Sequence, residues 1–99
     1  MSEAYLHVTS QPNPSNPEAT QAYLKGVLPL LLKAGGEVLA RTKLSKTIHG
    51  TSPGAMTLAM RFPDAASIEA VFDSAPYKDL TAYRDAGFLS MSIHIGHPL

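Results

Sequence analysis

The side chains best suited to chemistry in this sequence are one histidine and two arginines. His49 lies in a polar stretch, and an imidazole titrates close to neutral pH, which suits general acid or base catalysis. Arg41 and Arg84 carry the planar guanidinium that binds a carboxylate or a phenolate. Structural alternatives are a solvated loop histidine at His49, and an ion pair or a contact with a helix-end carbonyl at Arg84. We interpret His49 and Arg41 as the catalytic candidates.

Several other chemistries are disfavoured by residue type and spacing. The chain has no cysteine, which excludes a thiolate nucleophile, a disulfide scaffold and an iron–sulfur cluster. His94 and His97 fall on opposite sides of an extended strand, and no helix carries a His-Glu-x-x-His pattern. We therefore expect neither a metal site nor a cofactor.

Size and charge limit the classes of partner. The 99 residues, 44% of them hydrophobic, fit one domain that covers residues 1–99. Eight Lys and Arg residues balance eight Asp and Glu residues, which argues against nucleic-acid binding and leaves self-association favourable. The longest apolar run, 27–32, is far shorter than the roughly 20 residues of a membrane span. Glu3 also stands where a signal peptide would carry a basic residue, so we expect a cytoplasmic protein.

Short elements that alternate in type must position these side chains. Alternating or β-branched segments predict strands at 5–10, 37–43, 55–62 and 88–96. Apolar residues at three-and-four spacing predict a helix that begins at Ser15 or Asn16 and ends at Gly35-Gly36. Asp64 starts a second helix, and a short third helix follows Ser74. The order β-α-β-β-α-β is typical of a ferredoxin-like α+β fold, a four-stranded antiparallel sheet with helices on one face.

Alternation also assigns the two faces of the sheet, except in the strand at 37–43, where the two sides are nearly balanced. A mixed polar set that includes His7 and His94 falls on the face away from the helices. The bulky apolar set, predicted to lie under the helices, is Leu6, Val8, Met56, Leu58, Met60, Phe62, Leu89, Met91, Ile93 and Ile95.

The first and last strands are neighbours in this fold, which brings His7 and His94 together on the mixed face. If two copies pack through that face, both imidazoles become partly buried at the interface, where an unpartnered charge is costly. We expect such a dimer to weaken as the pH falls through roughly 6–6.5, where histidine ordinarily gains its proton. The alternative is that each ring is fully hydrogen-bonded and has no such effect.

Four stretches, in this order, resemble domain-of-unknown-function family 1330, of the dimeric α+β barrel superfamily. They are KAGGEVLAR at 33–41, IHG at 48–50, RFP at 61–63, and the pattern S-x-x-Y-x-x-L-x-x-x-R at 74–84. The resemblance implies a ferredoxin-like protomer whose sheet packs against a second copy, giving a homodimeric barrel. It implies no particular activity. Relatives in the superfamily include monooxygenases that need neither metal nor flavin, muconolactone isomerases and haem-degrading enzymes. The family usually has an acidic residue where this chain has His49.

The fold class places a ligand pocket between the sheet and the helices. We predict that it binds a small organic molecule and that the protein is a cofactor-independent enzyme of the monooxygenase or isomerase type. The alternative is a non-catalytic dimeric binding or structural module. Ser74 could instead cap a helix, and Tyr77 could pack its ring into the core. The candidate ligand-binding residues, beside Arg41 and His49, are Leu39, Met60, Phe72, Ser74, Tyr77 and Arg84.

Overall fold

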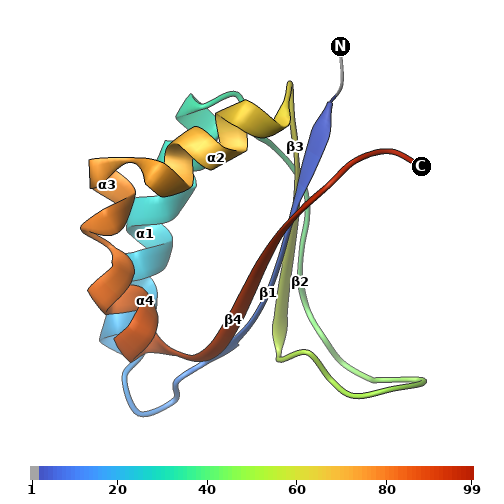
Figure 1. The fold of residues 1–99 in the computed structure, drawn as a ribbon. Helices are drawn as coiled ribbons and strands as arrows, with labels where there is room; N and C mark the ends of the chain where they lie inside the picture. The colour runs from blue at the N-terminus through green and yellow to red at the C-terminus, as the bar shows by residue number, and fades with distance from the viewer. Residues whose placement is uncertain (1–2) are drawn as a thin grey trace.

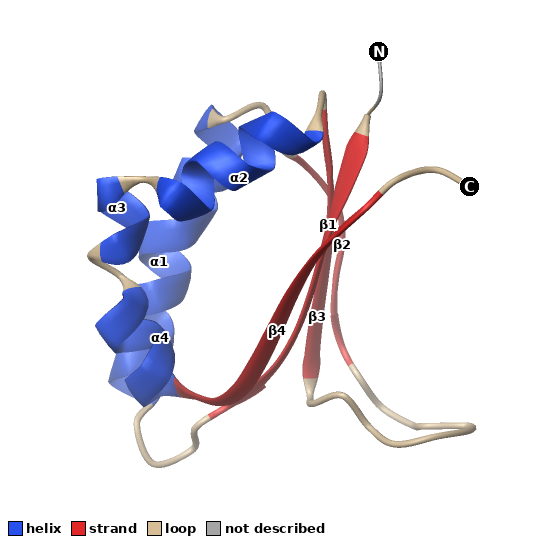
Figure 2. Cartoon of the chain, viewed as in Figure 1, coloured by secondary structure: helices blue, strands red, loops and turns tan. Residues whose placement is uncertain are grey.

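The computed structural model describes residues 3–99 and has the predicted α+β architecture. All the helices lie on one side of a single twisted sheet (Figures 1 and 2). No helix among these residues is long and apolar enough to cross a membrane. The elements in chain order are β1 (Ala4–Pro12), α1 (Pro17–Lys33), β2 (Glu37–Lys43), β3 (Met56–Phe62), α2 (Ala65–Asp73), α3 (Ala75–Lys78), α4 (Thr81–Gly87) and β4 (Phe88–Gly96).

The sheet has the strand order β2-β3-β1-β4, and every neighbouring pair is antiparallel. β1 and β3 are therefore the central strands, and β2 and β4 form the edges. The predicted strand bounds agree with the structure for β2 and β4. β1 is longer than predicted at both ends, and β3 begins one residue later.

Local sequence signals account for the helix ends. Asn16 caps α1 by accepting a hydrogen bond from the backbone N–H of Ala19, with Pro17 as the first helical residue, so the cap is Asn16 rather than Ser15. Gly35 follows the helix with φ +98°, the left-handed conformation that glycine adopts most easily. The Asp64 carboxylate caps α2 by accepting from the N–H of Ser67 at 2.8 Å, as predicted.

The segment after α2 differs from the single short helix that was predicted. It forms two short helices, α3 and α4, which meet at residues 79–80. Ser74 begins the first of them, because its hydroxyl accepts from the N–H of Tyr77 and donates to the carbonyl of Val71. Thr81 donates from its hydroxyl to the carbonyl of Lys78, which stabilises the turn between the two helices.

The predicted face assignment is confirmed except at Leu89, although Ile95, which lies opposite Leu6 on the helix side, is exposed rather than covered. The register between β1 and β4 shifts at Gln11 and Pro12, so Pro12 lies opposite Phe88. This irregularity turns Phe88 into the core and leaves Leu89 65% exposed. A strict two-residue alternation cannot anticipate such a shift.

A β-bulge resolves the ambiguity of β2. The register between β2 and β3 shifts between Val38 and Ala40, so Leu39 is the extra residue. Beyond the bulge, Arg41 lies opposite Leu58 and therefore faces the helix side of the sheet. Lys43, opposite Met56, faces the same way. Without the bulge, both cations would point away from the helices.

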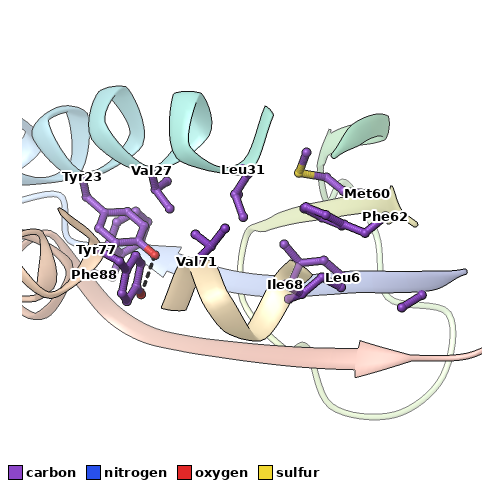
Figure 3. Packing of buried hydrophobic residues seen from close by; sticks show 11 residues of the cluster. Leu6, Tyr23, Val27, Leu31, Met60, Phe62, Ile68, Val71, Tyr77 and Phe88 are labelled. Carbon is purple, nitrogen blue, oxygen red and sulfur yellow. Dashed lines mark hydrogen bonds between the residues drawn. The ribbon is translucent and has the colours of Figure 1, made fainter. Parts of the chain in front are cut away.

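The most completely buried side chains of the core gather where α2 and α1 face β1 and β3 (Figure 3). Gly36 allows β2 to enter this region, because a Cβ there would lie 2.6 Å from the Phe62 ring and 2.8 Å from the Leu31 carbonyl oxygen. The five side chains with almost no exposed surface are Leu6, Leu31, Met60, Phe62 and Ile68.

Candidate functional site

A cavity of about 440 Å³ lies between α1 and the helix-covered face of the sheet. Strands β1, β3 and β4 contribute its floor, and α1 contributes the opposite wall, with Phe72 of α2 completing it. The size is within the range of small-molecule sites in proteins. The apolar side chains that line it include Val8, Leu28, Met56, Leu58, Met91 and Ile93.

Two cations line this cavity on the side of β2. Arg41 and Lys43 are both exposed, and the bulge at Leu39 directs them to the same face of the sheet as the cavity. Among the residues 3–99 that the structure describes, none of those lining the cavity is acidic. The site therefore combines an apolar interior with a positively charged edge.

A hydrogen-bonded pair of buried tyrosines lies at the α1 side of the cavity (Figure 3). The hydroxyls of Tyr23 and Tyr77 are 2.9 Å apart, and both residues are only 3% exposed. Arg84 of α4 donates from Nη1 to the Tyr77 hydroxyl at 3.2 Å and from Nε to the Asp85 carboxylate at 3.0 Å. Tyr23 lines the cavity, and Tyr77 connects it to Arg84.

This environment sets the protonation of the Tyr23 hydroxyl. Burial raises the pKa of Tyr23 far above its ordinary value, because the charged phenolate is poorly solvated there. The pKa of Arg84 is also raised, first by its hydrogen bond to Tyr77. At neutral pH the cluster therefore holds a protonated phenol beside a guanidinium cation.

The predicted site residues are placed in different parts of the fold. Arg41 and Phe72 line the cavity, whereas Met60 lies in the dense core and Leu39 is half-exposed at the bulge. His49 belongs to the exposed 44–55 loop, which extends on the side of the sheet away from the helices (Figure 1). The cavity and this loop are thus on opposite sides of the sheet.

The remaining predicted residues have defined contacts. Ser74 hydrogen-bonds the backbone at the start of α3. Tyr77 and Arg84 are hydrogen-bonded to each other, and Tyr77 is also hydrogen-bonded to Tyr23. His7 and His94 lie directly opposite each other on β1 and β4, on the open face of the sheet. Their role at an interface stays a prediction.

Tyr23 and Lys43 are among the lining residues that were not predicted as site residues from the sequence. Tyr23 fits the three-and-four spacing of the apolar residues in α1, although a buried tyrosine needs a hydrogen-bond partner and so carries a signal of its own. Lys43 was missed because the bulge that reverses its side is not visible in the alternation. Within residues 3–99, no group of three His, Asp or Glu side chains converges to hold a metal ion.

Comparison with known proteins identifies the family. The family model for a domain of unknown function, DUF1330, matches residues 3–95. The chain belongs to this family. No functionally curated protein matches this DUF1330 member by sequence.

Solved structures share the fold of this DUF1330 chain at low sequence identity. A protein of unknown function from Rhodopseudomonas palustris is 16% identical with a TM-score of 0.82, over 99% of this chain and 83% of that one. A protein of unknown function from Nitrosomonas europaea is 22% identical with a TM-score of 0.62, over 100% and 91%. SnoaB, a cofactor-independent oxygenase from Streptomyces nogalater, is 7% identical with a TM-score of 0.69, over 100% and 95%. At these identities the comparison supports a common fold.

Proposed function

We propose that this protein binds a small, largely apolar organic anion in the cavity between α1 and the sheet. The observation that carries this proposal is the cavity itself, about 440 Å³ in volume with apolar side chains on its floor and wall. Small ligands are held in such sites by apolar contact, while a few polar groups orient them. Arg41 and Lys43 supply the positive groups at the edge.

An anion suits this site better than a cation. The described lining contains two cations and no carboxylate, so a negative group gains favourable electrostatic contact and a positive group does not. The guanidinium of Arg41 suits a carboxylate, sulfonate or phenolate because two of its N–H groups can donate in parallel.

The probe for this proposal is 1-anilinonaphthalene-8-sulfonate, which combines an apolar ring system with a sulfonate. We expect saturable binding by the folded wild-type protein, measured by fluorescence and by calorimetry. Leu28→Trp should abolish it, because the indole would fill the cavity from α1. Arg41→Gln should weaken it several-fold, while Lys25→Gln, at an exposed position on α1, should leave it unchanged. Equal binding by wild-type protein and Leu28→Trp would contradict the proposal.

We further propose that a bound substrate reacts there without a cofactor, in the manner of an oxygenase or isomerase. Two facts support this: the fold is shared with a cofactor-independent oxygenase, and a protonated phenol in an apolar cavity can stabilise an oxyanion as it forms. Anthrone, an easily enolised aromatic ketone, is a suitable probe, since O2 oxidises it to anthraquinone and water. We expect faster O2 uptake with wild-type protein than with Leu28→Trp. Equal rates, with dye binding intact, would instead favour the non-catalytic binding module.

We propose that two copies assemble through the open face of the sheet. No helix of residues 3–99 covers this face (Figure 1), and the sequence has no net charge to keep copies apart. The histidine pair of His7 and His94 lies on it, near Tyr5 and the ion pair of Arg61 with Glu37. A dimer burying this face would hold the imidazoles away from water.

Sedimentation velocity tests this assembly. We expect a dimer at neutral pH that dissociates as the pH falls through roughly 6–6.5, since protonating imidazoles at an interface is costly. His94→Lys should weaken the dimer at neutral pH by adding a permanent charge, whereas Gln21→Lys on α1 adds the same charge at an exposed position away from the face. A monomer under all conditions would refute the assembly.

A further inference from the structure

We propose that the Tyr23 hydroxyl donates a hydrogen bond to an oxygen of the bound molecule, with Tyr77 and Arg84 as positioning residues. The ligand class is then an apolar organic anion whose ring also carries a phenol, enol or ketone oxygen. This inference rests on the proposed function, because it assigns the group that orients the ligand within the same cavity. The supporting observation is the series of hydrogen bonds from Arg84 through Tyr77 to Tyr23, which lines the cavity.

The donor and acceptor groups of Arg84, Tyr77 and Tyr23 indicate the direction of the hydrogen bonds among them. A guanidinium has only N–H donors, so Arg84 must donate and the Tyr77 oxygen must accept at 3.2 Å. If Tyr77 then donates its own hydrogen to Tyr23 across 2.9 Å, the hydrogen of Tyr23 is free for a further acceptor. Tyr23 lines the cavity, and we place the acceptor, an oxygen of the ligand, there.

The opposite direction is less consistent with the surroundings. If Tyr23 donated to Tyr77, the hydrogen of Tyr77 would need another acceptor, and Tyr77 is buried away from the cavity lining. Among residues 3–99, the other side-chain contact to the Tyr77 hydroxyl is with Arg84, which cannot accept. The first arrangement also lets each hydrogen bond strengthen the next.

Aromatic packing holds both rings in position. Tyr23 meets Phe88 edge to face with ring centroids 5.5 Å apart, and Tyr77 meets Phe72 in the same manner at 4.7 Å. Such contacts restrict the rings, so the hydroxyl of Tyr23 is preorganised rather than mobile. Burial also keeps the phenol protonated by raising its pKa, so it retains a hydrogen to donate.

A near-isosteric pair of probes isolates the oxygen contact. The hydroxyl of 2-naphthol can accept from Tyr23, while 2-methylnaphthalene presents a methyl group of similar size. We expect wild-type protein to prefer 2-naphthol by about tenfold, since a hydrogen bond within an apolar site is worth that much in affinity. Tyr23→Phe should remove most of the preference and leave 2-methylnaphthalene binding unchanged, which also shows that the variant is folded. Tyr83→Phe, at an exposed tyrosine, should leave the preference unchanged.

Titration of bound 2-naphthol tests the positioning residues. Burial raises the pKa of any phenol in this cavity, whereas a donor aimed at the naphthol oxygen stabilises the naphtholate. We therefore expect 2-naphthol to titrate at lower pH when bound to wild-type protein than when bound to Tyr23→Phe. Tyr77→Phe and Arg84→Gln should each remove part of that difference, whereas Arg61→Gln on the open face should not. Loss of affinity without any change in this titration would assign Tyr77 and Arg84 a structural role only.

The outcomes separate this inference from the proposed function. If neither probe binds and the anionic dye does not bind either, the cavity proposal fails. If the dye alone binds, the cavity accepts anions and the inference about Tyr23 fails. If both bind equally, or the preference survives Tyr23→Phe, the cavity binds apolar molecules but Tyr23 is not the donor.

Discussion

The helix-covered face of the sheet has two ends that differ in how completely they are filled. At the packed end, which we define as Ala4, Leu6, Met60, Phe62 and Ile68, each side chain is almost completely buried. At the cavity end, defined as Val8, Met56, Leu58, Met91 and Ile93, strands β1, β3 and β4 also present apolar side chains, but these remain partly accessible. Apolar character is therefore not what distinguishes the two ends.

The helices account for the difference. α2 packs onto β1 and β3 at the packed end, while at the other end of α1 the neighbour is α4 (Figure 1). Thr20 of α1 donates from its hydroxyl to the carbonyl of Gly87 at 2.6 Å, which ties the start of α1 to the end of α4. At the packed end, α2 thus fills the space next to the sheet. At the other end, the space between α1 and the sheet remains as the cavity.

The largest expected contrast is between two methionines on β3. Met60→Ala removes a completely buried side chain at the packed end and should lower the free energy of unfolding by about 2–5 kcal/mol. Met56→Ala removes the same atoms from the cavity wall and should cost less than about half as much, because the site is already partly empty. Urea unfolding of both variants measures this. Equal losses would mean that the two ends are equally well packed.

A substitution at Gly36 tests how closely the side chains are packed at the packed end. Gly36→Ala places a Cβ against the Phe62 ring, the Met60 methyl group and the backbone oxygen of Leu31, and the backbone cannot easily move aside. We expect a loss of about 1–3 kcal/mol in the free energy of unfolding. Gly50→Ala is the control for a loop glycine, since its Cβ would meet no atom within 4 Å. Its positive φ limits the cost there to backbone strain.

The buried phenol of Tyr23, at the cavity end, should make the folded protein less stable at alkaline pH. Its pKa is raised in the folded protein, so above about pH 10 the unfolded chain loses a proton that the folded chain keeps. The free energy of unfolding should therefore fall by up to about 1.4 kcal/mol per pH unit from this group. Urea titrations at pH 9, 10 and 11 should show a shallower fall for Tyr23→Phe and no change in slope for Tyr83→Phe. A slope unaffected by Tyr23→Phe would argue against this burial effect.

The smallest expected effect on stability is at the edge of the cavity. Arg41 is exposed on an edge strand, so Arg41→Gln should change the free energy of unfolding by less than about 0.5 kcal/mol. The same variant should weaken dye binding several-fold. Thermal unfolding and fluorescence titration on one preparation measure both. A large loss of stability would place Arg41 among the structural residues of the fold.

Much of the fold was predictable because its signals are local. Asn16 and Asp64 cap helices as the sequence indicates, and Gly35 ends α1 in the conformation that glycine favours. Alternation along β1 and β3 correctly predicted the side of the sheet that meets the helices. The error at Leu89 arose because a register shift depends on how two distant strands meet, and neither strand reveals it alone.

The candidate site was predictable only in part. A cavity between sheet and helices follows from the fold class, and Arg41 and Phe72 were expected to line it. Leu39 and Met60 were expected there too, but the bulge places Leu39 at an exposed position and Met60 belongs to the packed end. The contact between Tyr23 and Tyr77 joins residues 54 positions apart, and no spacing in the sequence indicates it.

Local signals in the amino-acid sequence predict the order of elements, the helix caps, most of the division between the two faces and the family. These depend on backbone preferences and on side-chain alternation, which act over a few residues. The three-dimensional packing is needed to show where the core leaves a cavity, which face of the sheet Arg41 and Lys43 lie on, and which hydroxyls form hydrogen bonds with each other. Those features depend on the bulge in β2 and on how far α1 lies from the sheet, and both result from packing among segments distant in the chain.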